Sequence, residues 1–328
     1  MLRRGAVGDP VRDLQQRLAT AGHPVPSDAA GAFGPYTEAC VIAFQRSRGL
    51  RVDGICGSET WGALVESGFR LGDRLLYLRH PMLRGDDVGE LQRRLNALGF
   101  DAGREDGILG PDTESALRQF QINAGLASDG VAGPATHRAL DRLDSLAGGS
   151  VASVRELDAL RHQTRRLADR RIFLAAEPGL DALGEAVRRG LATAGALTVL
   201  DSSGGDDSDL ADAANAFEAD LALALRTGDL PGPRCSFFAT RTFRSEAGFL
   251  LATRIEEELA GVLGPAGPPE GKSYRMLRET RMAAVVCSPA CAGDVDVMQV
   301  VVARAAAVAE AIVRGVRSWA EAPLDTLC

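Results

Sequence analysis

Apolar residues recur at intervals of three and four in the first 145 residues of the chain. This spacing places the side chains on one face of a helix, so each series predicts an amphipathic helix. The residues concerned are Val11, Leu14, Leu18, Val88, Leu91, Leu95 and Leu98. Each predicted helix is followed by a Gly-Pro pair, and proline suits the first turn of a further helix.

A longer motif occurs twice in the same order. It begins with Gly-Pro, passes through Phe-Gln and Gly-Leu, and ends in Asp-Gly-x-x-Gly-x-x-Thr, with copies at 34–60 and 110–136. The Asp-Gly segment predicts a tight turn, because glycine accepts a positive φ. With a third short helix closing each copy, the repeat predicts two three-helix units, at residues 1–70 and 80–145.

The remainder of the chain has a different pattern, in which short continuous apolar runs alternate with segments of helical period. Such runs are typical of strands buried on both faces, and the alternation predicts an α/β domain with a mostly parallel sheet and flanking helices at 170–322. The predicted strands are Arg171–Ala176, Leu197–Leu200, Leu221–Leu225, Cys235–Ala239 and Ala283–Cys287. The predicted helices are Asp181–Ala194, a helix from Asp209, Ser245–Leu263 and Val297–Ala320.

Residues 146–169 predict a glycine-containing linker and an arginine-rich helix between the repeats and this domain. The helix is either a solvated connector or a docking surface for an acidic partner, a nucleotide sugar or a membrane face. Together these segments predict a multidomain protein.

Composition narrows the possible partners and location. The net charge of −7 argues against a nucleic-acid partner. No signal-peptide core follows Met1, and no apolar run approaches the roughly 18 residues of a membrane span. We therefore expect a cytoplasmic protein whose six cysteines are free thiols.

The repeat resembles the peptidoglycan-binding module found beside cell-wall hydrolases. The Asp-Gly-x-x-Gly-x-x-Thr ending with Phe-Gln upstream carries the resemblance. It implies a peptidoglycan fragment or precursor as ligand; the alternative is a packing module that has lost glycan binding. The candidate ligand contacts are the aromatic residues Tyr36, Trp61 and Tyr77 and the turn aspartates Asp53 and Asp129.

The third domain resembles the zinc-dependent N-acetylmuramoyl-L-alanine amidases. The resemblance lies in Glu177-Pro178-Gly179 after the first strand, in 214–221 before the central strand and in 277–282 before the late strand. The family cleaves the bond between muramic acid and L-alanine with a zinc ion held by two histidines and a glutamate, and a second glutamate accepts the proton of water. As a whole, the chain is similar to mycobacterial cytoplasmic amidase-like regulators of peptidoglycan synthesis.

The zinc-binding and catalytic positions of that family are altered in this chain. The first histidine corresponds to Leu180, the second to Arg226 and the catalytic glutamate to Ser288, and the glutamate ligand has no clean match, although Glu177 or Glu185 could lie near it. All four histidines precede residue 170. We therefore predict no metal and no catalytic residue. Arg226 should either pair with a local acid or bind an anionic ligand.

Three functions are consistent with these features. The first is a catalytically inactive, cytoplasmic regulator or scaffold of peptidoglycan synthesis, for which the resemblance implies UDP-N-acetylglucosamine enolpyruvyl transferase, and the lipid II export machinery, as partners. The second is a divergent amidase, the one case that requires zinc. The third is a peptidoglycan-binding protein without catalysis.

Overall fold

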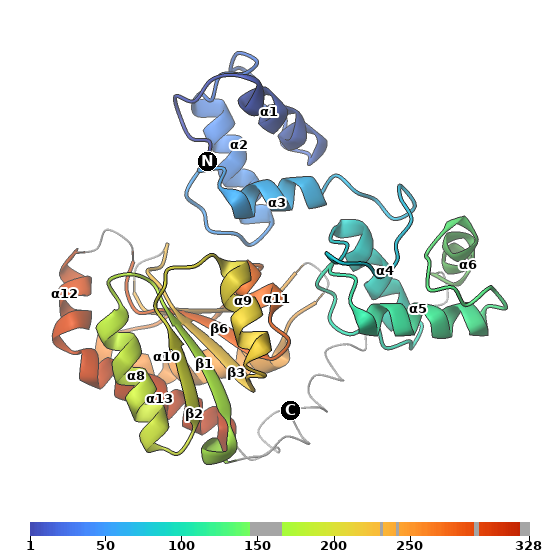
Figure 1. Cartoon of the computed structure of the whole chain (residues 1–328). Coiled ribbons are helices and arrows are strands. Elements are labelled where there is room, and N and C mark those ends of the chain that lie inside the picture. Colours follow the sequence, from blue (N-terminus) through green and yellow to red (C-terminus); the bar gives the residue numbers. More distant parts are fainter. Residues whose placement is uncertain (145–165, 230–231, 241–242, 292–294, 322–328) are drawn as a thin grey trace. The chain divides into compact units, whose positions relative to one another are not determined.

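The computed structural model describes residues 1–144, 166–229, 232–240, 243–291 and 295–321. The chain divides into two compact units, 1–155 with 240–243 and 156–239 with 244–328 (Figure 1). Most of the predicted linker and arginine-rich helix at 146–169 lies outside the described residues, and its last part forms a short 3₁₀ turn, η1 (Leu167–Asp169). No helix in the described ranges has both the length and the apolar character needed to cross a bilayer.

The first unit contains the two predicted three-helix repeats. The helices are α1 (Asp9–Thr20), α2 (Pro35–Ser47), α3 (Ser58–Glu66), α4 (Asp86–Ala97), α5 (Pro111–Asn123) and α6 (Pro134–Asp144). Each repeat has its own core, one around Leu14 and Phe44 and the other around Leu91 and Phe120. The helices expected to begin at a Gly-Pro pair do begin at its proline, and the prediction of two three-helix repeats is confirmed.

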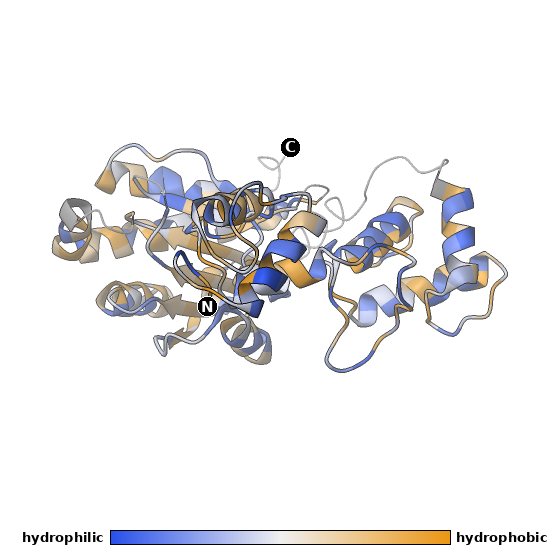
Figure 2. Ribbon diagram, turned by 90° about the horizontal axis from the view of Figure 1, so that it is seen from above, coloured by the Kyte–Doolittle hydropathy of each residue, from blue (hydrophilic) through white to orange (hydrophobic). Residues whose placement is uncertain are grey.

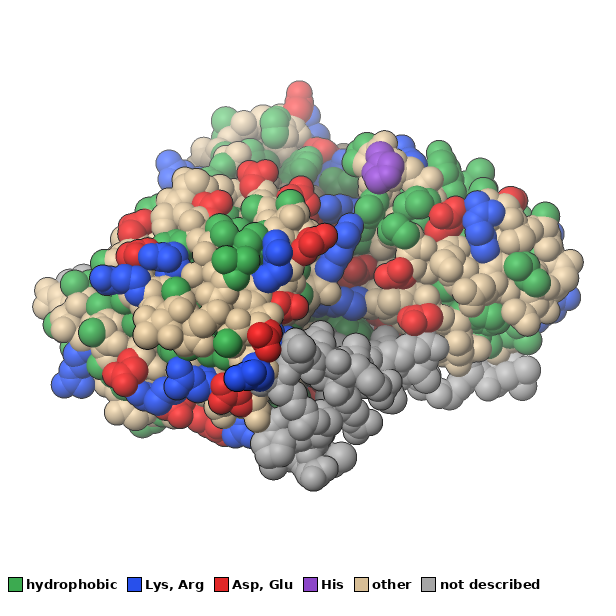
Figure 3. All heavy atoms as spheres, turned by 60° about the horizontal axis from the view of Figure 1, so that its bottom comes forward, with side chains coloured by type: hydrophobic (Ala, Val, Ile, Leu, Met, Phe, Trp, Pro, Cys, Tyr) green, Lys and Arg blue, Asp and Glu red, His purple; other side chains and the backbone are tan. Residues whose placement is uncertain are grey.

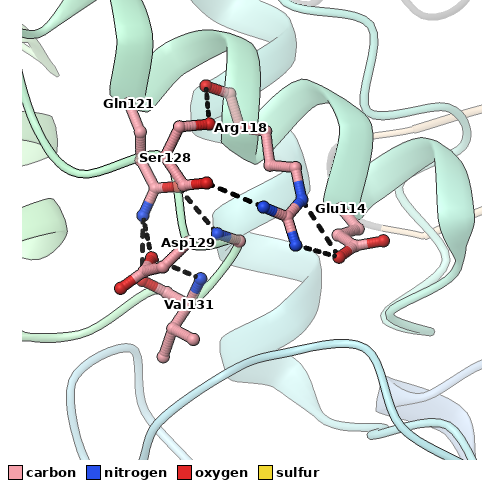
Figure 4. A network of polar contacts seen from close by, with 7 residues as sticks. Glu114, Arg118, Gln121, Ser128, Asp129 and Val131 are labelled. Carbon is pink, nitrogen blue, oxygen red and sulfur yellow. Dashed lines mark hydrogen bonds and ion pairs between the residues drawn. The ribbon is translucent and has the colours of Figure 1, made fainter.

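A buried glutamine joins each Asp-Gly turn to the helix before it. Gln121 donates from Nε2 to Asp129 Oδ1 at 2.8 Å and to the Val131 carbonyl at 3.1 Å, and its Oε1 accepts from the Gly130 amide at 3.0 Å (Figure 4). Gln45 makes the corresponding contacts in the first repeat. The glutamine amide therefore satisfies the polar groups of a turn that packs against a helix.

The same contact occurs at two further places that the twofold sequence repeat does not reveal. Gln92 of α4 binds the turn at Gly107 and the hydroxyl of Thr113. Gln15 of α1 binds Gly31 and Thr37 in the same way. Each three-helix repeat is therefore built from two half-units. Each half-unit contains its own glutamine, its own glycine turn and its own threonine.

The second unit is a six-stranded sheet of order β2-β1-β3-β6-β4-β5 with helices on both faces. The strands are β1 (Arg171–Ala176), β2 (Leu197–Asp201), β3 (Leu221–Leu225), β4 (Arg234–Phe238), β5 (Glu270–Lys272) and β6 (Ala283–Ser288). Only the β4–β6 pairing is antiparallel, so the prediction of a mostly parallel sheet is confirmed.

Helices α8, α10 and α13 pack on one face of the sheet, and α9 and α11 lie on the other (Figure 1). Their bounds are α8 (Asp181–Thr193), α9 (Asp207–Ala216), α10 (Glu246–Leu263), α11 (Arg275–Glu279), α12 (Val295–Ala303) and α13 (Ala305–Glu321). Coloured by hydropathy, the helices carry hydrophilic residues alongside apolar ones, as expected of helices that bury one side (Figure 2).

Three details differ from the sequence prediction. The closing helix is two helices, α12 and α13, which meet at Arg304. Strand β5 and the short helix α11 were not predicted. Helix α9 begins at Asp207 rather than Asp209, because the Asp206 carboxylate caps it by accepting from the amides of Ser208 and Asp209.

Candidate functional site: the carboxyl edge of the sheet

The residues at the expected zinc site lie at one edge of the sheet. Strands β1, β3 and β6 are neighbours and run parallel, so their carboxyl ends meet at this edge. Glu177 and Leu180 follow β1, Arg226 follows β3, and Ser288 ends β6. In open α/β sheets this edge is where ligands bind. The structure thus places these four residues, which the resemblance to the amidases singled out, at the same edge of the sheet.

Leu180 belongs to the hydrophobic core. Its side chain is 2% exposed and lies in the same cluster as Leu183 and Val187 of α8. Its amide donates to the Glu177 carbonyl at 2.9 Å, which closes the turn between β1 and α8. At this position the side chain stabilises packing and offers no ligand atom.

Arg226 is held by protein groups on both its backbone and its side chain. Its amide donates to the Cys287 carbonyl of β6 at 3.0 Å. Its guanidinium forms an ion pair with Asp207 at the start of α9, and both side chains are largely buried. The other Asp207 oxygen accepts from the Met276 amide of α11 at 3.3 Å. Of the two roles predicted for Arg226, the structure shows pairing with a local acid.

The two glutamates proposed near the missing ligand are also bound by protein groups. Glu177 Oε2 accepts from the amide and the hydroxyl of Thr227, at 2.8 and 3.1 Å. Glu185 binds Arg188 through two contacts of 2.7 Å, and this hydrogen bonding lowers the pKa of its carboxyl group. Glu177 therefore joins the ends of β1 and β3, whereas Glu185 lies on α8 with its own partner.

Ser288 closes the edge beside Gly228. The Ser288 side chain is 7% exposed, and a Cβ added at Gly228 would lie 3.0 Å from Ser288 Cβ. The Gly228 amide donates to the Ala290 carbonyl at 2.7 Å, so the two chain segments stay in contact beyond the strands. Within the described ranges, no three His, Cys, Asp or Glu side chains gather in a way that suits a metal ion.

The candidate contacts in the repeats fall into two groups. Tyr36 is 50% exposed in the first turn of α2, and Tyr77 is also exposed. Trp61 is partly buried, with the Arg17 guanidinium 5.4 Å from its ring centroid. Exposed Tyr36 thus offers a stacking surface, whereas the Trp61 ring is partly used in packing.

The turn aspartates are used within the fold. Asp53 Oδ1 accepts from Gln45 and from the Ile55 amide. Asp129 makes the same contacts, and hydrogen bonds from the Val131 amide and Gln121 lower the pKa of its carboxyl group (Figure 4). Both residues close a turn, and ligand contact through their second oxygens stays a prediction.

Two acids at these sites were not selected from the sequence. Asp207 belongs to the acidic segment 201–209, and nothing in the spacing of the sequence indicates Arg226 as its partner. Asp28 accepts from the Thr37 amide at 2.6 Å, at the start of α2. Burial raises the pKa of the Asp28 carboxyl group, but hydrogen bonds from Thr37, Tyr36 and Gly34 more than offset this and leave it lowered.

Two glutamine-linked helical repeats and an α/β domain with a mostly parallel six-stranded sheet define a multidomain, amidase-like protein. Residues 7–64 and 84–140 match the family model described as a putative peptidoglycan binding domain. The N-acetylmuramoyl-L-alanine amidase CwlM of Mycobacterium tuberculosis is 34% identical over 305 residues, which cover 83% of this chain and 74% of CwlM. The chain therefore belongs to the same family as CwlM.

Other relatives match smaller parts of the chain. The N-acetylmuramoyl-L-alanine amidase CwlL of Bacillus licheniformis is 34% identical over 164 residues, or 44% of this chain and 46% of CwlL. The solved amidase Ami1 of Mycobacterium smegmatis superposes with a TM-score of 0.41 at 14% identity, over 48% of this chain and all of Ami1. The match thus spans less than half the length of CwlL.

Proposed function

We propose that this chain is a catalytically inactive amidase homologue that acts as a cytoplasmic regulator or scaffold of peptidoglycan synthesis. The Arg226–Asp207 ion pair carries the proposal, because it lies where the amidase resemblance implies a zinc-binding histidine. The buried Leu180 supports it, since a leucine in the core stands where the first histidine is implied.

The charge of Arg226 opposes metal binding at this edge. A guanidinium is protonated at any physiological pH and has no acceptor atom. Near a protein surface, two unit positive charges about 4 Å apart repel each other by about 4 kcal/mol. The repulsion between one such charge and a dication is about twice as large. Asp207 offsets the charge of Arg226 but is itself bound by it. Zinc binding would therefore require the pair to break.

The proposed ligand of the repeats is a peptidoglycan fragment or precursor, which the match to the peptidoglycan-binding model supports. The proposed protein partners are UDP-N-acetylglucosamine enolpyruvyl transferase and the lipid II export machinery, as the resemblance to mycobacterial regulators implies. On the face that Figure 3 shows, acidic and basic side chains are interspersed. Among the coloured side chains of that face, the basic ones form no continuous stripe of the kind that follows a nucleic-acid backbone.

A divergent amidase is the second candidate, because CwlM and CwlL are both named as N-acetylmuramoyl-L-alanine amidases. The two candidates differ in metal content and in product. We expect the full chain, purified with added zinc, to hold far less than one equivalent and to release no stem peptide from muropeptides. CwlL prepared in parallel serves as the active control. Stoichiometric zinc together with peptide release would overturn the proposal and establish the amidase.

Binding tests separate a regulator from a plain wall-binding protein. The full chain should retain a cytosolic precursor-synthesis enzyme from a lysate and appear in the soluble fraction of cells. Retention on insoluble peptidoglycan alone would favour the third function. For the repeat ligand, Tyr36→Ala should weaken binding of soluble muropeptides, whereas Ile122→Ala, at an exposed apolar residue outside the candidate contacts, is the matched control and should leave binding unchanged.

A further inference from the structure

The two edges of the sheet are protected to different degrees. Strand β5, at one edge, has three residues, of which Glu270 and Lys272 form an ion pair at 3.2 Å. Strand β2, at the other edge, has five residues and a single charge, Asp201, at its end. Short, charged edges resist pairing with another chain, whereas longer apolar edges invite it. Strand β2 therefore lacks the protection that β5 has.

The outer strand also carries uncovered apolar side chains. Leu197 and Val199 are 56% and 40% exposed, and their alternation places them on one face. Leu200 points to the other face, where a Cβ added at Gly184 of α8 would lie 3.2 Å from it. Phe173 pairs with Val199 in register and is 2% exposed. On this face of the sheet, side chains are therefore buried as far as β1 and exposed on β2.

The charges beside β2 change sign along the strand. Helix α8 follows β1 and precedes β2, so it begins at the carboxyl end of β2, which places Asp181 and Asp201 at the same end of the strand. It ends near the amino end of β2, where Arg188 and Arg189 lie on the side turned away from α13, since Gly190 faces α13. The Arg189 side chain is 69% exposed. Glu185 pairs with Arg188 and lies 3.9 Å from Arg189, so this end carries one net positive charge, whereas the other end is acidic.

We infer that β2 docks against β2 of a second copy of this chain, in an antiparallel pair about a twofold axis. In that arrangement the acidic end of each copy meets the basic end of the other, whereas a parallel pair would oppose like charges. A register centred on Thr198 places Leu197 opposite Val199 of the partner subunit. The four apolar side chains then cover one another on the shared face.

The contact is small, which sets the expected strength. One five-residue strand and the rim of one helix bury less than the roughly 1,200 Å² of a standard interface. The dimer should therefore be weak and depend on protein concentration. The same small area makes the interface sensitive to single substitutions at its centre.

Sedimentation velocity of the full chain over a wide concentration range tests the inference. The wild type should shift from monomer to dimer as its concentration rises. Val199→Lys should weaken the dimer by about tenfold or more, because each ammonium group would replace an apolar contact with Leu197 of the partner subunit and the two ammonium groups would lie diagonally across the shared face. Leu75→Lys, at a 54% exposed apolar residue of the first unit, should have no effect. A wild type that stays monomeric throughout, or a dimer unchanged by Val199→Lys, overturns the inference.

Charge exchange tests the antiparallel arrangement. Arg189→Glu should weaken the dimer by about two- to fivefold, as expected for exposed ion pairs. Adding Asp181→Arg to that variant places an arginine at the end that faces the new glutamate of the other copy, and this should restore the dimer. Failure of the second change to restore it contradicts the antiparallel arrangement.

Cross-linking tests the register. Under mild oxidation, Thr198→Cys should form a disulfide-linked dimer more readily than Val199→Cys, because only residues at the axis lie opposite their own copy. The wild type, which contains Cys40 and Cys291 on partly exposed positions, gives the background. A link no stronger than this background in both variants counts against pairing through β2.

Discussion

Replacing Glu256 with glutamine should remove a pH dependence from the stability of the second unit. Glu256 lies on α10 and is 4% exposed. Its Oε1 accepts from the Cys235 amide of β4 at 2.6 Å. Burial raises the pKa of the carboxyl group to about 7, and the hydrogen bond from Cys235 and the charge of Arg234 limit the rise. The nearby Glu270 adds to it.

The direction of the pH dependence follows from the number of protons that the folded and unfolded states bind. The folded carboxyl group has a pKa of about 7, and the unfolded one has an ordinary value near 4.3. Between these values the folded state binds more protons, so the free energy of unfolding falls as pH rises. Below about pH 4 both states are protonated, and above about pH 7 the loss is complete. The full contribution of Glu256 to the free energy of unfolding is about 4 kcal/mol, at about 1.4 kcal/mol for each pKa unit.

The experiment compares unfolding by urea at pH 5 and at pH 8. A Trp61→Phe background leaves Trp319 of α13 as the tryptophan that reports on the second unit. Between the two pH values, the free energy of unfolding of the parent should fall by about 3 kcal/mol relative to that of Glu256→Gln. Glu257→Gln, at a more exposed neighbour paired with Arg254, should follow the parent. Equal pH dependence in the parent and Glu256→Gln would refute the reasoning.

Two further predictions concern the repeats. Gln121→Ala should destabilise the first unit by about 2–4 kcal/mol in thermal unfolding, because it leaves several buried polar groups without a partner, whereas Gln119→Ala on the exposed face should change little. Gly107→Ala should lower the melting temperature of the first unit more than Gly99→Ala. Both glycines have a positive φ, but only at Gly107 would the new Cβ lie 2.9 Å from a backbone oxygen, that of Gly85. Similar melting temperatures within either pair would contradict these assignments.

Helices and strands could be predicted where the hydrophobic pattern agrees with the residues that begin or end an element, such as a Gly-Pro pair. The strand Leu221–Leu225 is a continuous apolar run, and α2 begins at its Gly-Pro pair as expected. Strand β5 could not be predicted, because Glu270–Lys272 has no apolar residue and forms through pairing with β4. The break at Arg304 interrupts a pattern whose helical period continues on both sides.

The half-units of the repeats escaped detection for a physical reason. In the second half-unit Gln45 precedes Thr60 by 15 residues, but in the first Gln15 precedes Thr37 by 22. The turn of the first half-unit also has Ala30 in place of the aspartate. The contact tolerates both changes, because the glutamine recognises backbone groups at the turn rather than a fixed spacing.

The candidate site was located by motif order, but its chemistry was decided by tertiary contacts. Leu180, Arg226 and Ser288 could be placed because strand ends anchor them. Asp207 could not be chosen as the partner of Arg226, because the two residues are 19 positions apart and meet only when α9 packs on the sheet.

Contacts between protein groups join several chain segments at the carboxyl edge. In a zinc site, one ion would hold together ligands from several chain segments. Here, Arg226 and Asp207 join β3 to α9, and the second oxygen of Asp207 reaches α11. Glu177 and Thr227 join β1 to β3. Protein pairs thus connect the segments at this edge, as the proposed loss of zinc binding requires.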